Sequence, residues 1–295
     1  MILVTGASGF VGSRLVVRAL ARGHRVRGLY HHPPTAPPPG VQVAVGDLDS
    51  PTALAPALRG VQVVFHTAAL VASQKPASPG AYDRVNRIGT ENLAAAARMA
   101  GVERFVLLSG LGTRAAPRGT YMATRHGMER AVLALEIPSV ILRPSVLFGE
   151  GAEFVAALDR VIRSSPVVPL LGGGRVRLQP LHVQDLITCL LAAGEDGRLA
   201  GRQIELGGAE QLSFKELIEA ICQVGGRHRW LAPVPLGLAR LQAGLMEAVL
   251  PRPPLTVAAL ELFGFDNVTR PDSVRRDFGF DPIGFRAHLQ AHGLS

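Results

Sequence analysis

The chain has 295 residues, of which 47% are hydrophobic and 18% are charged. This balance excludes a mainly disordered chain, and no apolar run approaches the roughly 20 residues of a transmembrane helix. The first residues lack the basic region of an export signal, and the two cysteines, Cys189 and Cys222, form neither a disulfide framework nor a zinc-binding spacing. We therefore expect a globular cytoplasmic protein with no bound metal.

The formal net charge of +8 would suit an anionic partner such as nucleic acid. Only two of the 31 basic residues are lysines, however, and the arginines are spread along the chain. A compositional preference for arginine explains this pattern better than a binding surface does. We therefore expect no nucleic-acid partner.

Short apolar runs alternate with helix-period segments over the first 150 residues. The pattern indicates an α/β fold whose parallel strands are covered by helices on both faces. The prolines between Pro33 and Pro39 predict a surface loop. Predicted strands are residues 2–5, 26–30, 41–45, 61–66, 104–109 and 140–142, and predicted helices are residues 10–22, 81–99 and 121–135.

Beyond Gly149 the pattern is less regular. Ser213 followed by Glu216 has the form of a capping box, which predicts the start of a helix. We expect a nucleotide-binding domain over residues 1–150 and a smaller C-terminal lobe over residues 151–295, interleaved with that core. Predicted helices of the lobe are residues 154–162, 183–193, 213–224, 236–250 and 255–263.

A glycine motif links the first predicted strand to the first predicted helix. Gly6 permits a tight turn, Gly9 lets the backbone approach a pyrophosphate, and Gly12 lets the helix pack closely on the sheet. The helix N-terminus offers free N–H groups to the phosphates. A glycine turn without a ligand is the structural alternative. The residues expected to bind a dinucleotide here are Gly6, Ser8, Gly9, Phe10, Val11 and Gly12.

Two further segments follow predicted strands. The Asp47 carboxylate, with Leu48 beside it, is placed to accept a hydrogen bond from the amino group of an adenine. The alternative is that Asp47 only caps the helix that starts after Pro51. Thr67, Ala68 and Ala69 are small enough for the backbone to lie along a dinucleotide.

Ser109 ends the fifth predicted strand, and Tyr121 and Arg125 share one helix face because they are four residues apart. A phenol can donate a proton to a carbonyl or accept one from an alcohol, and a nearby cation favours its ionised form. Ser109 suits the orientation of a substrate oxygen. After a nucleotide loop we expect these three residues to be catalytic, whereas in isolation such residues are more often structural.

With these motifs the chain resembles the short-chain dehydrogenase/reductase superfamily, in its extended or atypical branch, over nearly its whole length. Segments around residues 170–185 and 253–268 are most similar to the nucleotide-binding accessory subunit of respiratory complex I and its bacterial relatives. The residues that carry the wider resemblance include Gly6-x-x-Gly9-x-x-Gly12, Gly46-Asp47-Leu48, His66-Thr67-Ala68-Ala69, Asn86, Gly89-Thr90-Glu91-Asn92, Tyr121-x-x-x-Arg125, Arg143-Pro144-Ser145 and His182-Val183-x-Asp185.

The resemblance implies a Rossmann-type doubly wound sheet that binds NAD or NADP, with a small, mostly helical C-terminal lobe over a substrate cleft. It implies that the glycines hold the pyrophosphate, that Asp47 and Leu48 contact the adenine, and that Ala68 and Ala69 flank the cofactor. It further implies that Pro144 borders the nicotinamide and that Tyr121 is the acid/base.

Two positions depart from the family pattern. Arg125 stands where the family has lysine, and this exchange is not conservative because a guanidinium is larger, planar and more diffuse in charge. Nucleotide binding can survive this change while turnover falls. Ser109 lies about one residue before the usual serine or threonine, which leaves Thr113 as an alternative.

The choice between NAD and NADP depends on the end of the second predicted strand. This chain has Tyr30, His31 and His32 there, without the carboxylate that NAD enzymes use for the ribose 2′-hydroxyl. His31 stands where NADP-binding relatives often carry arginine, which favours NADP(H) weakly. Histidines that simply face solvent are the alternative.

Three functions therefore remain open. The first is an oxidoreductase that moves a hydride to or from a carbonyl or hydroxyl carbon. The second is a catalytically weak NADP(H)-binding accessory or assembly protein of a respiratory NADH:quinone oxidoreductase, at the periphery of the inner membrane. The third is an NAD-dependent nucleotide-sugar epimerase or dehydratase. Residues 236–250 suit a pocket for an apolar small molecule, although such a stripe usually packs into a core.

Overall fold

The computed structural model describes residues 1–251 and 253–294. Its backbone contacts divide the chain into two compact units. The first unit comprises Met1–Leu70, Pro76–Arg143 and Leu186–Ile204, and the second comprises Val71–Lys75, Pro144–Asp185 and the described residues from Glu205 onward.

A seven-stranded sheet is the centre of the first unit, in the order β11-β6-β5-β4-β1-β2-β3. Neighbouring strands from β3 to β6 are all parallel. The sheet confirms the predicted α/β, Rossmann-type fold class. Its strands are β1 (Ile2–Thr5), β2 (Val26–Tyr30), β3 (Gln42–Val45), β4 (Val63–His66), β5 (Arg104–Leu108), β6 (Ser139–Pro144) and β11 (Gln203–Leu206).

The sequence did not predict β11. Its four residues alternate between exposed and buried, and two of them are Gln203 and Glu205. Most of the other strands of this sheet contain continuous apolar runs, a pattern that β11 lacks.

The strand order reverses beside β1. Thr5 at the end of β1 is paired in register with His66 at the end of β4. In open α/β sheets, ligands bind where the strand order reverses, outside the carboxyl ends of the strands. The reversal therefore brings the loop after β1 next to the loop after β4.

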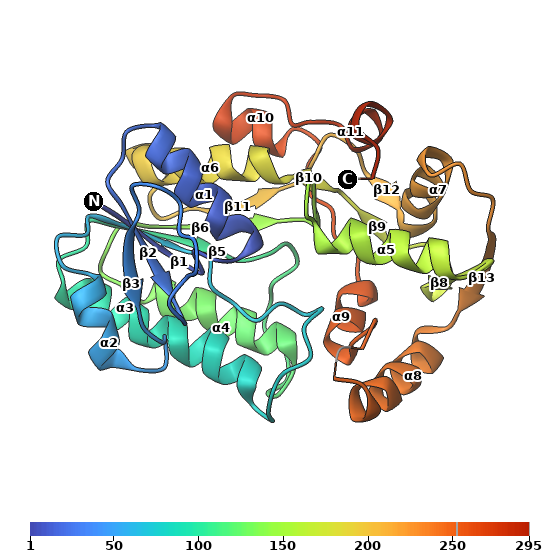
Figure 1. Cartoon of the computed structure of the whole chain (residues 1–295), viewed down its shortest axis with the longest axis horizontal. Helices are drawn as coiled ribbons and strands as arrows, with labels where there is room; N and C mark the ends of the chain where they lie inside the picture. The colour runs from blue at the N-terminus through green and yellow to red at the C-terminus, as the bar shows by residue number, and fades with distance from the viewer. Residues whose placement is uncertain (252, 295) are drawn as a thin grey trace. The chain divides into compact units, whose positions relative to one another are not determined.

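Helices cover both faces of this sheet (Figure 1). α1 (Phe10–Ala21) and α6 (Val183–Glu195) lie on one face, and α2 (Pro51–Ala57), α3 (Gly89–Met99) and α4 (Tyr121–Leu133) lie on the other. Burial explains these positions, since Leu15 of α1 and Leu93 of α3 are fully buried.

The predicted helix over residues 81–99 differs in its first part, which is a π-helix, η1 (Asp83–Ile88). The fully buried side chain of Asn86 accepts a hydrogen bond from Leu70 N (2.8 Å) and donates to Leu70 O (3.1 Å) and Thr124 Oγ1 (3.3 Å). These bonds tie the loop after β4 to α4. A π-helical turn inside a helix often marks a functional region.

The second unit has its own apolar core, around Phe148, Ile162, Leu217 and Phe285. The predicted capping box is confirmed, because Ser213 Oγ accepts a hydrogen bond from Glu216 N and Glu216 Oε2 accepts one from Ser213 N. The α-helices of the second unit are α5 (Glu153–Ser164), α7 (Phe214–Val224), α8 (Leu236–Val249), α9 (Val257–Glu261), α10 (Ser273–Phe278) and α11 (Phe285–His292). Its strand pairs are β7 (Leu147–Phe148) with β10 (Leu181–His182), β8 (Val167–Leu171) with β13 (Trp230–Val234), and β9 (Arg177–Leu178) with β12 (Leu212–Ser213).

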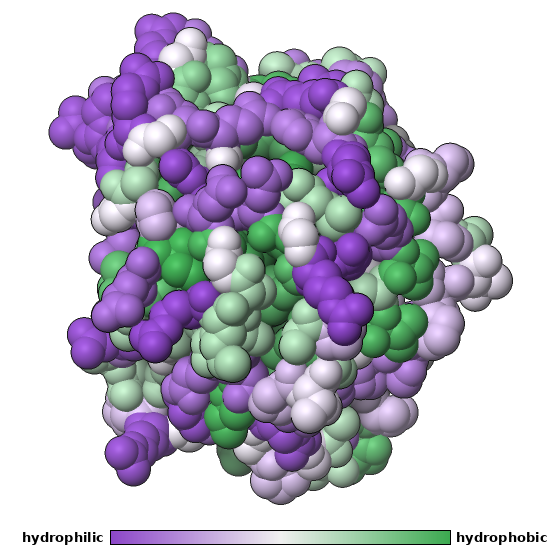
Figure 2. Space-filling view, turned by 90° about the vertical axis from the view of Figure 1, so that its left-hand side faces the viewer, coloured by the Kyte–Doolittle hydropathy of each residue, from purple (hydrophilic) through white to green (hydrophobic). Residues whose placement is uncertain are grey.

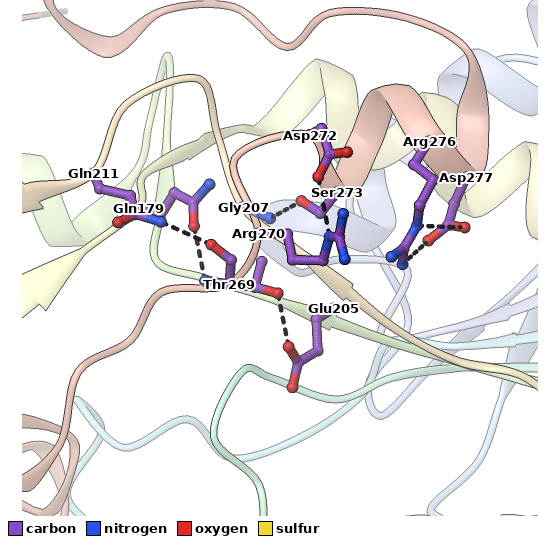
Figure 3. Close-up of polar contacts among 10 residues, drawn as sticks. All are labelled: Gln179, Glu205, Gly207, Gln211, Thr269, Arg270, Asp272, Ser273, Arg276 and Asp277. Carbon is purple, nitrogen blue, oxygen red and sulfur yellow. Dashed lines mark hydrogen bonds and ion pairs between the residues drawn. The ribbon is translucent and has the colours of Figure 1, made fainter.

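A polar network joins distant segments of the second unit (Figure 3). The fully buried Gln179 accepts a hydrogen bond from Thr269 N (2.8 Å) and donates to Gly208 O (2.9 Å). Thr269 Oγ1 donates to Glu205, and Gln211 donates to Thr269 O. The segment around Gln179 therefore forms part of the internal scaffold of this unit.

The surface of the protein carries apolar residues in several places. On the side drawn in Figure 2, hydrophilic residues and smaller groups of hydrophobic residues share the surface. The edge strand β3 exposes Val43 and Val45, and α8 exposes Leu241 and Leu245. Within the described residues, no helix is long and apolar enough to cross a bilayer.

Candidate active site

The glycine loop after β1 is closely packed against the loop after β4. Gly6 has a φ of +66°, and a Cβ atom there would lie 2.8 Å from the Cα atom of Ala68. A Cβ atom on Gly12 would lie 2.1 Å from the carbonyl oxygen of Gly6. Both contacts involve backbone atoms, so only glycine fits at these two positions.

The N-terminus of α1 is suited to an anion. Its first residue is Phe10, its cap is Gly9 with no side-chain hydrogen bond, and its first turn contains no acidic residue. The N–H groups and positive dipole end of the helix thus meet no capping carboxylate. Ser8 and Gly9 are exposed, whereas the side chain of Val11 is buried and leaves its backbone for a ligand. This cradle fits the pyrophosphate of a dinucleotide.

The loop after β4 supports the glycine loop through side-chain bonds. Thr67 Oγ1 donates to Thr5 O (2.7 Å), and Ala68 N donates to Thr5 Oγ1 (3.3 Å). Ala69 packs partly buried against the core of the first unit. The structure therefore places Thr67 and Ala68 at the glycine loop.

His66, at the end of β4, is a fully buried titratable group. Thr90 Oγ1 donates to Asn86 O, so His66 Nε2 donates to Thr90 Oγ1 (2.8 Å) and Nδ1 accepts from Thr5 Oγ1 (2.7 Å). Burial lowers the pKa of His66 to about 3, so the ring is neutral at physiological pH. Its role here is to join β1 and β4 to α3.

The predicted adenosine contacts lie together at the ends of β2 and β3. His31 Nε2 is 2.8 Å from Asp47 Oδ2, and His31 Nδ1 is 2.9 Å from His32 Nε2. Leu48 is buried, and a Cβ atom on Gly89 would lie 2.8 Å from the Leu48 Cβ atom. The side chain of Leu48 thus points into the core, which leaves only its backbone for an adenine.

Tyr121 is the first residue of α4, after the Thr120 cap, and it is buried. Arg125 Nη1 donates to the Tyr121 hydroxyl over 3.5 Å, and the Arg125 guanidinium lies 5.7 Å from the ring centroid. The ring of Tyr82, just before η1, meets the Tyr121 ring edge to face at 5.3 Å. The structure therefore brings together the predicted tyrosine–arginine pair and places a second aromatic ring, that of Tyr82, against Tyr121.

Sequence reasoning missed the role of Gly110. A Cβ atom there would lie 1.9 Å from Arg125 Nη2, so the guanidinium lies directly on the backbone of Gly110. Gly110 lies two residues after Leu108, the last residue of β5, and this position at a strand end was the available signal. Its missing side chain leaves room for an arginine beside Tyr121.

Ser109 lies at the same strand end, but its hydroxyl is already engaged. It donates to Glu129 Oε1 over 2.6 Å, and Glu129 is almost fully buried in an ion pair with Arg143. Thr113 Oγ1, the alternative, donates to Gly110 O over 2.7 Å. Sequence reasoning missed Glu129, although it lies eight residues after Tyr121, on the same helix face. Pro144 directly follows Arg143 as the last residue of β6.

A model of the NAD dependent epimerase/dehydratase family matches residues 2–207, a range that includes the glycine loop, Tyr121 and Arg125. The chain belongs to this family. Membership confirms the prediction of an NAD(P)-binding protein of the short-chain dehydrogenase/reductase type.

The following three proteins are similar to this chain. A ceramide reductase of Caulobacter vibrioides is 36% identical over 196 residues, which cover 65% of this chain and 60% of that protein. A 3 beta-hydroxysteroid dehydrogenase/Delta 5→4-isomerase of Mycobacterium tuberculosis is 31% identical over 325 aligned positions, covering 96% of this chain and 86% of that protein. The structure of a short-chain dehydrogenase/reductase superfamily protein from Agrobacterium tumefaciens with bound NAD has a TM-score of 0.76 and 23% identity, covering 100% of this chain and 96% of that chain.

Proposed function

We propose that this protein is an NAD(P)-dependent oxidoreductase that transfers a hydride to or from a carbonyl or hydroxyl carbon of a small apolar molecule. The observation that supports it most directly is the contact between the Tyr121 hydroxyl and the Arg125 guanidinium at 3.5 Å. This pair follows β5 in the same unit as the glycine loop.

Tyr121 and Arg125 suit the proton transfer that accompanies the hydride transfer. When bound, NAD(P) supplies or accepts the hydride. In the reducing direction the Tyr121 hydroxyl donates its proton to the carbonyl oxygen, and in the oxidising direction the phenolate accepts the hydroxyl proton. The Arg125 guanidinium donates a hydrogen bond to the hydroxyl of the buried Tyr121, so it can hold that hydroxyl in a fixed orientation.

The residues around the Tyr121–Arg125 pair form a hydrogen-bond network that suits the positioning of the pair. Glu129 binds Ser109 and Arg143 together, and Arg143 also donates to Gln203 Oε1 (2.7 Å). These bonds fix the carboxyl ends of β5 and β6. We propose that Ser109 acts mainly through this network, by holding Gly110 under Arg125, and that Pro144 borders the nicotinamide.

The proposed substrate class is an apolar alcohol or ketone. Its support is the names of two relatives, one a ceramide reductase and the other a 3 beta-hydroxysteroid dehydrogenase. For the cofactor we propose that His31 faces a 2′-phosphate, which favours NADP(H). Asp47 opposes this with its negative charge 2.8 Å from His31, so we expect the preference over NAD(H) to be small.

Arg125 in the lysine position favours a second candidate. A catalytically weak NADP(H)-binding accessory or assembly protein of a respiratory NADH:quinone oxidoreductase, at the periphery of the inner membrane, needs the glycine loop but no turnover. The nucleotide-sugar epimerase or dehydratase reaction also fits the family.

Replacement of one hydroxyl tests the main proposal. Tyr121→Phe should lower the turnover of a long-chain or steroid ketone by about 100-fold or more, the usual contribution of a general acid, with unchanged NADPH and NADH affinity measured by fluorescence. The chain has three tyrosines, and Tyr30→Phe is the matched control because the buried Tyr30 hydroxyl has no partner among the described residues.

The alternatives give different results in the same assays. Tight nucleotide binding without turnover of any carbonyl or alcohol, and no gain on Arg125→Lys, would favour the accessory protein. Interconversion of nucleotide sugars without net oxidation would favour the epimerase.

A further inference from the structure

Tyr82 lies against Tyr121, the proposed proton donor, although the two residues belong to different helices of the first unit. Tyr82 directly precedes the π-helix η1. The ring centroids of Tyr82 and Tyr121 are 5.3 Å apart and the ring planes are inclined at 70°. This edge-to-face arrangement is one of the favourable geometries of aromatic pairs. The ring of the buried Tyr121 therefore has a specific aromatic neighbour.

Two further contacts join the η1 segment to α4. Asn86 Nδ2 donates to Thr124 Oγ1 over 3.3 Å. A Cβ atom on Gly127 would lie 2.7 Å from Arg87 Cδ, so the stem of Arg87 packs on the backbone of α4. Together with the aromatic pair, these contacts fix the η1 segment along the first two turns of α4.

The π-helical turn explains how Arg87 and Tyr82 can both face α4. In an α-helix each residue turns by about 100°, so Arg87 would point about 140° away from Tyr82. In a π-helix the hydrogen bonds join residues five apart, which brings residue i+5 back to the side of residue i. The register of η1 therefore allows Tyr82 to reach Tyr121 while Arg87 packs on the same helix.

The side chains that anchor η1 are themselves held by polar contacts. Arg87 Nε donates to Asp83 Oδ1 (2.7 Å), and Arg87 Nη1 donates to Glu91 Oε1 (2.9 Å). Asn86 is fully buried, and all its bonds described above remain inside the first unit. Tyr82 is thus attached to a well-fixed segment rather than to a loop.

We propose that Tyr82 is a positioning residue for proton transfer by Tyr121, an inference that rests on the proposed oxidoreductase function. Tyr121 is the first residue of α4, where backbone N–H groups lack partners within the helix. Arg125 contacts the hydroxyl of Tyr121, and Tyr82 contacts its ring. The two contacts restrict the rotation of the Tyr121 side chain, so that its hydroxyl meets a bound carbonyl in one orientation.

The kinetics of two substitutions test the proposal. Tyr82→Leu removes the ring and should lower kcat for a ketone roughly 10-fold to 100-fold, because displacing a catalytic group by about 1 Å costs up to about 100-fold. The KM for NADPH should stay the same, since the glycine loop is untouched. Tyr82→Phe keeps the ring and should retain the kcat of the unmodified chain.

Phe65→Leu is the matched control for the loss of packing. Phe65 is buried in β4, and a Cβ atom on Gly194 would lie 2.4 Å from its ring, so the ring faces α6, across the sheet from α4 (Figure 1). This variant should unfold at a lower temperature but retain kcat. A loss of kcat as large as that of Tyr82→Leu would assign both losses to destabilisation and overturn the proposal.

Fluorine resonances give a readout that does not depend on turnover. The chain has three tyrosines, so labelling with 3-fluorotyrosine gives three signals, which Tyr30→Phe and Tyr121→Phe assign. Tyr82→Leu should shift the Tyr121 signal, because the neighbouring ring is lost. Tyr82→Phe should leave the Tyr121 signal in place, and the Tyr30 signal should stay unchanged in both variants.

Equal kcat in Tyr82→Leu and the unmodified chain, or an unmoved Tyr121 signal, would overturn the positioning role and leave the oxidoreductase function standing. Equal losses of kcat in Tyr82→Leu and Tyr82→Phe would also overturn it, because the Tyr82 hydroxyl would then matter instead of the ring. Absence of turnover in the unmodified chain would overturn the oxidoreductase function and the positioning role with it.

Discussion

At the scale of single residues, the candidate active site depends on Gly110, whose lack of a side chain leaves room for Arg125. The guanidinium of Arg125 reaches the Tyr121 hydroxyl while it lies on the bare backbone of Gly110. A guanidinium is planar and spreads its charge over three nitrogens, so it needs a flat and open surface beside the tyrosine. Gly110 supplies that surface, which explains how an arginine is accommodated in the position of the family's lysine.

Gly110→Ala tests this arrangement. The new methyl group would occupy the place of Arg125 Nη2 and push the guanidinium away from Tyr121, so we expect kcat to fall about 10-fold because the Tyr121 hydroxyl loses the hydrogen bond that orients it. Thermal unfolding should change little, since the displaced group is the end of a flexible side chain. Gly197→Ala is the control, because its methyl group would meet only Arg104 Nη2 at 3.8 Å. An unchanged kcat in Gly110→Ala would show that Arg125 does not assist Tyr121.

At the scale of elements, the junction of β1 and α1 carries the nucleotide site. Gly6 and Gly12 are needed for the loop itself, since a Cβ atom at either position collides with backbone. Gly9 differs, because its φ of −76° suits any residue and its Cβ atom would lie 3.1 Å from Gly6 O. A side chain at position 9 therefore leaves the fold possible and occupies the space in front of the helix N-terminus.

Gly9→Val should leave the protein folded but weaken NADPH and NADH binding at least about 100-fold, because the valine blocks the approach of the pyrophosphate. Fluorescence titration measures the affinity, and circular dichroism checks the fold. Gly197→Val, distant in sequence from this junction, should bind the nucleotides as the unmodified chain does. Full affinity in Gly9→Val would mean that the dinucleotide binds elsewhere.

At the scale of the whole molecule, one buried histidine couples stability to pH. The pKa of His66 is lowered to about 3 by burial, from about 6.5 in an unfolded chain. Below pH 6.5 the unfolded chain takes up a proton that the folded protein cannot accept. The free energy of unfolding should therefore fall by about 1.4 kcal/mol per pH unit from this residue alone, as pH decreases from about 6.5 towards about 3.

Urea unfolding at about pH 7 and about pH 5 measures this contribution. His66→Gln keeps hydrogen-bonding groups between Thr5 and Thr90 but cannot titrate, so its stability should depend less on pH than that of the unmodified chain. His228→Gln, at an exposed position, should retain the full dependence. Parallel pH profiles for His66→Gln and the unmodified chain would contradict the assignment.

Much of this molecule was predictable from short-range patterns. β1 and β2 were predicted with their observed bounds, and α1 and α4 begin at the predicted residues. These elements were recognisable because their apolar spacing and glycine punctuation are properties of neighbouring residues. The pairing of Tyr121 with Arg125 was accessible for the same reason, since four residues make one helical turn.

The α/β class, the glycine loop and the tyrosine–arginine pair could be predicted because each depends on the order and spacing of residues close together in the chain. The place of β11 in the sheet, the bond between Ser109 and Glu129, and the position of Arg125 on Gly110 became known only from the folded chain. The same holds for the exposure of Leu238, Leu241 and Leu245 on α8. These features depend on contacts between segments that are far apart in the sequence, and such contacts cannot be predicted from the local spacing of apolar residues.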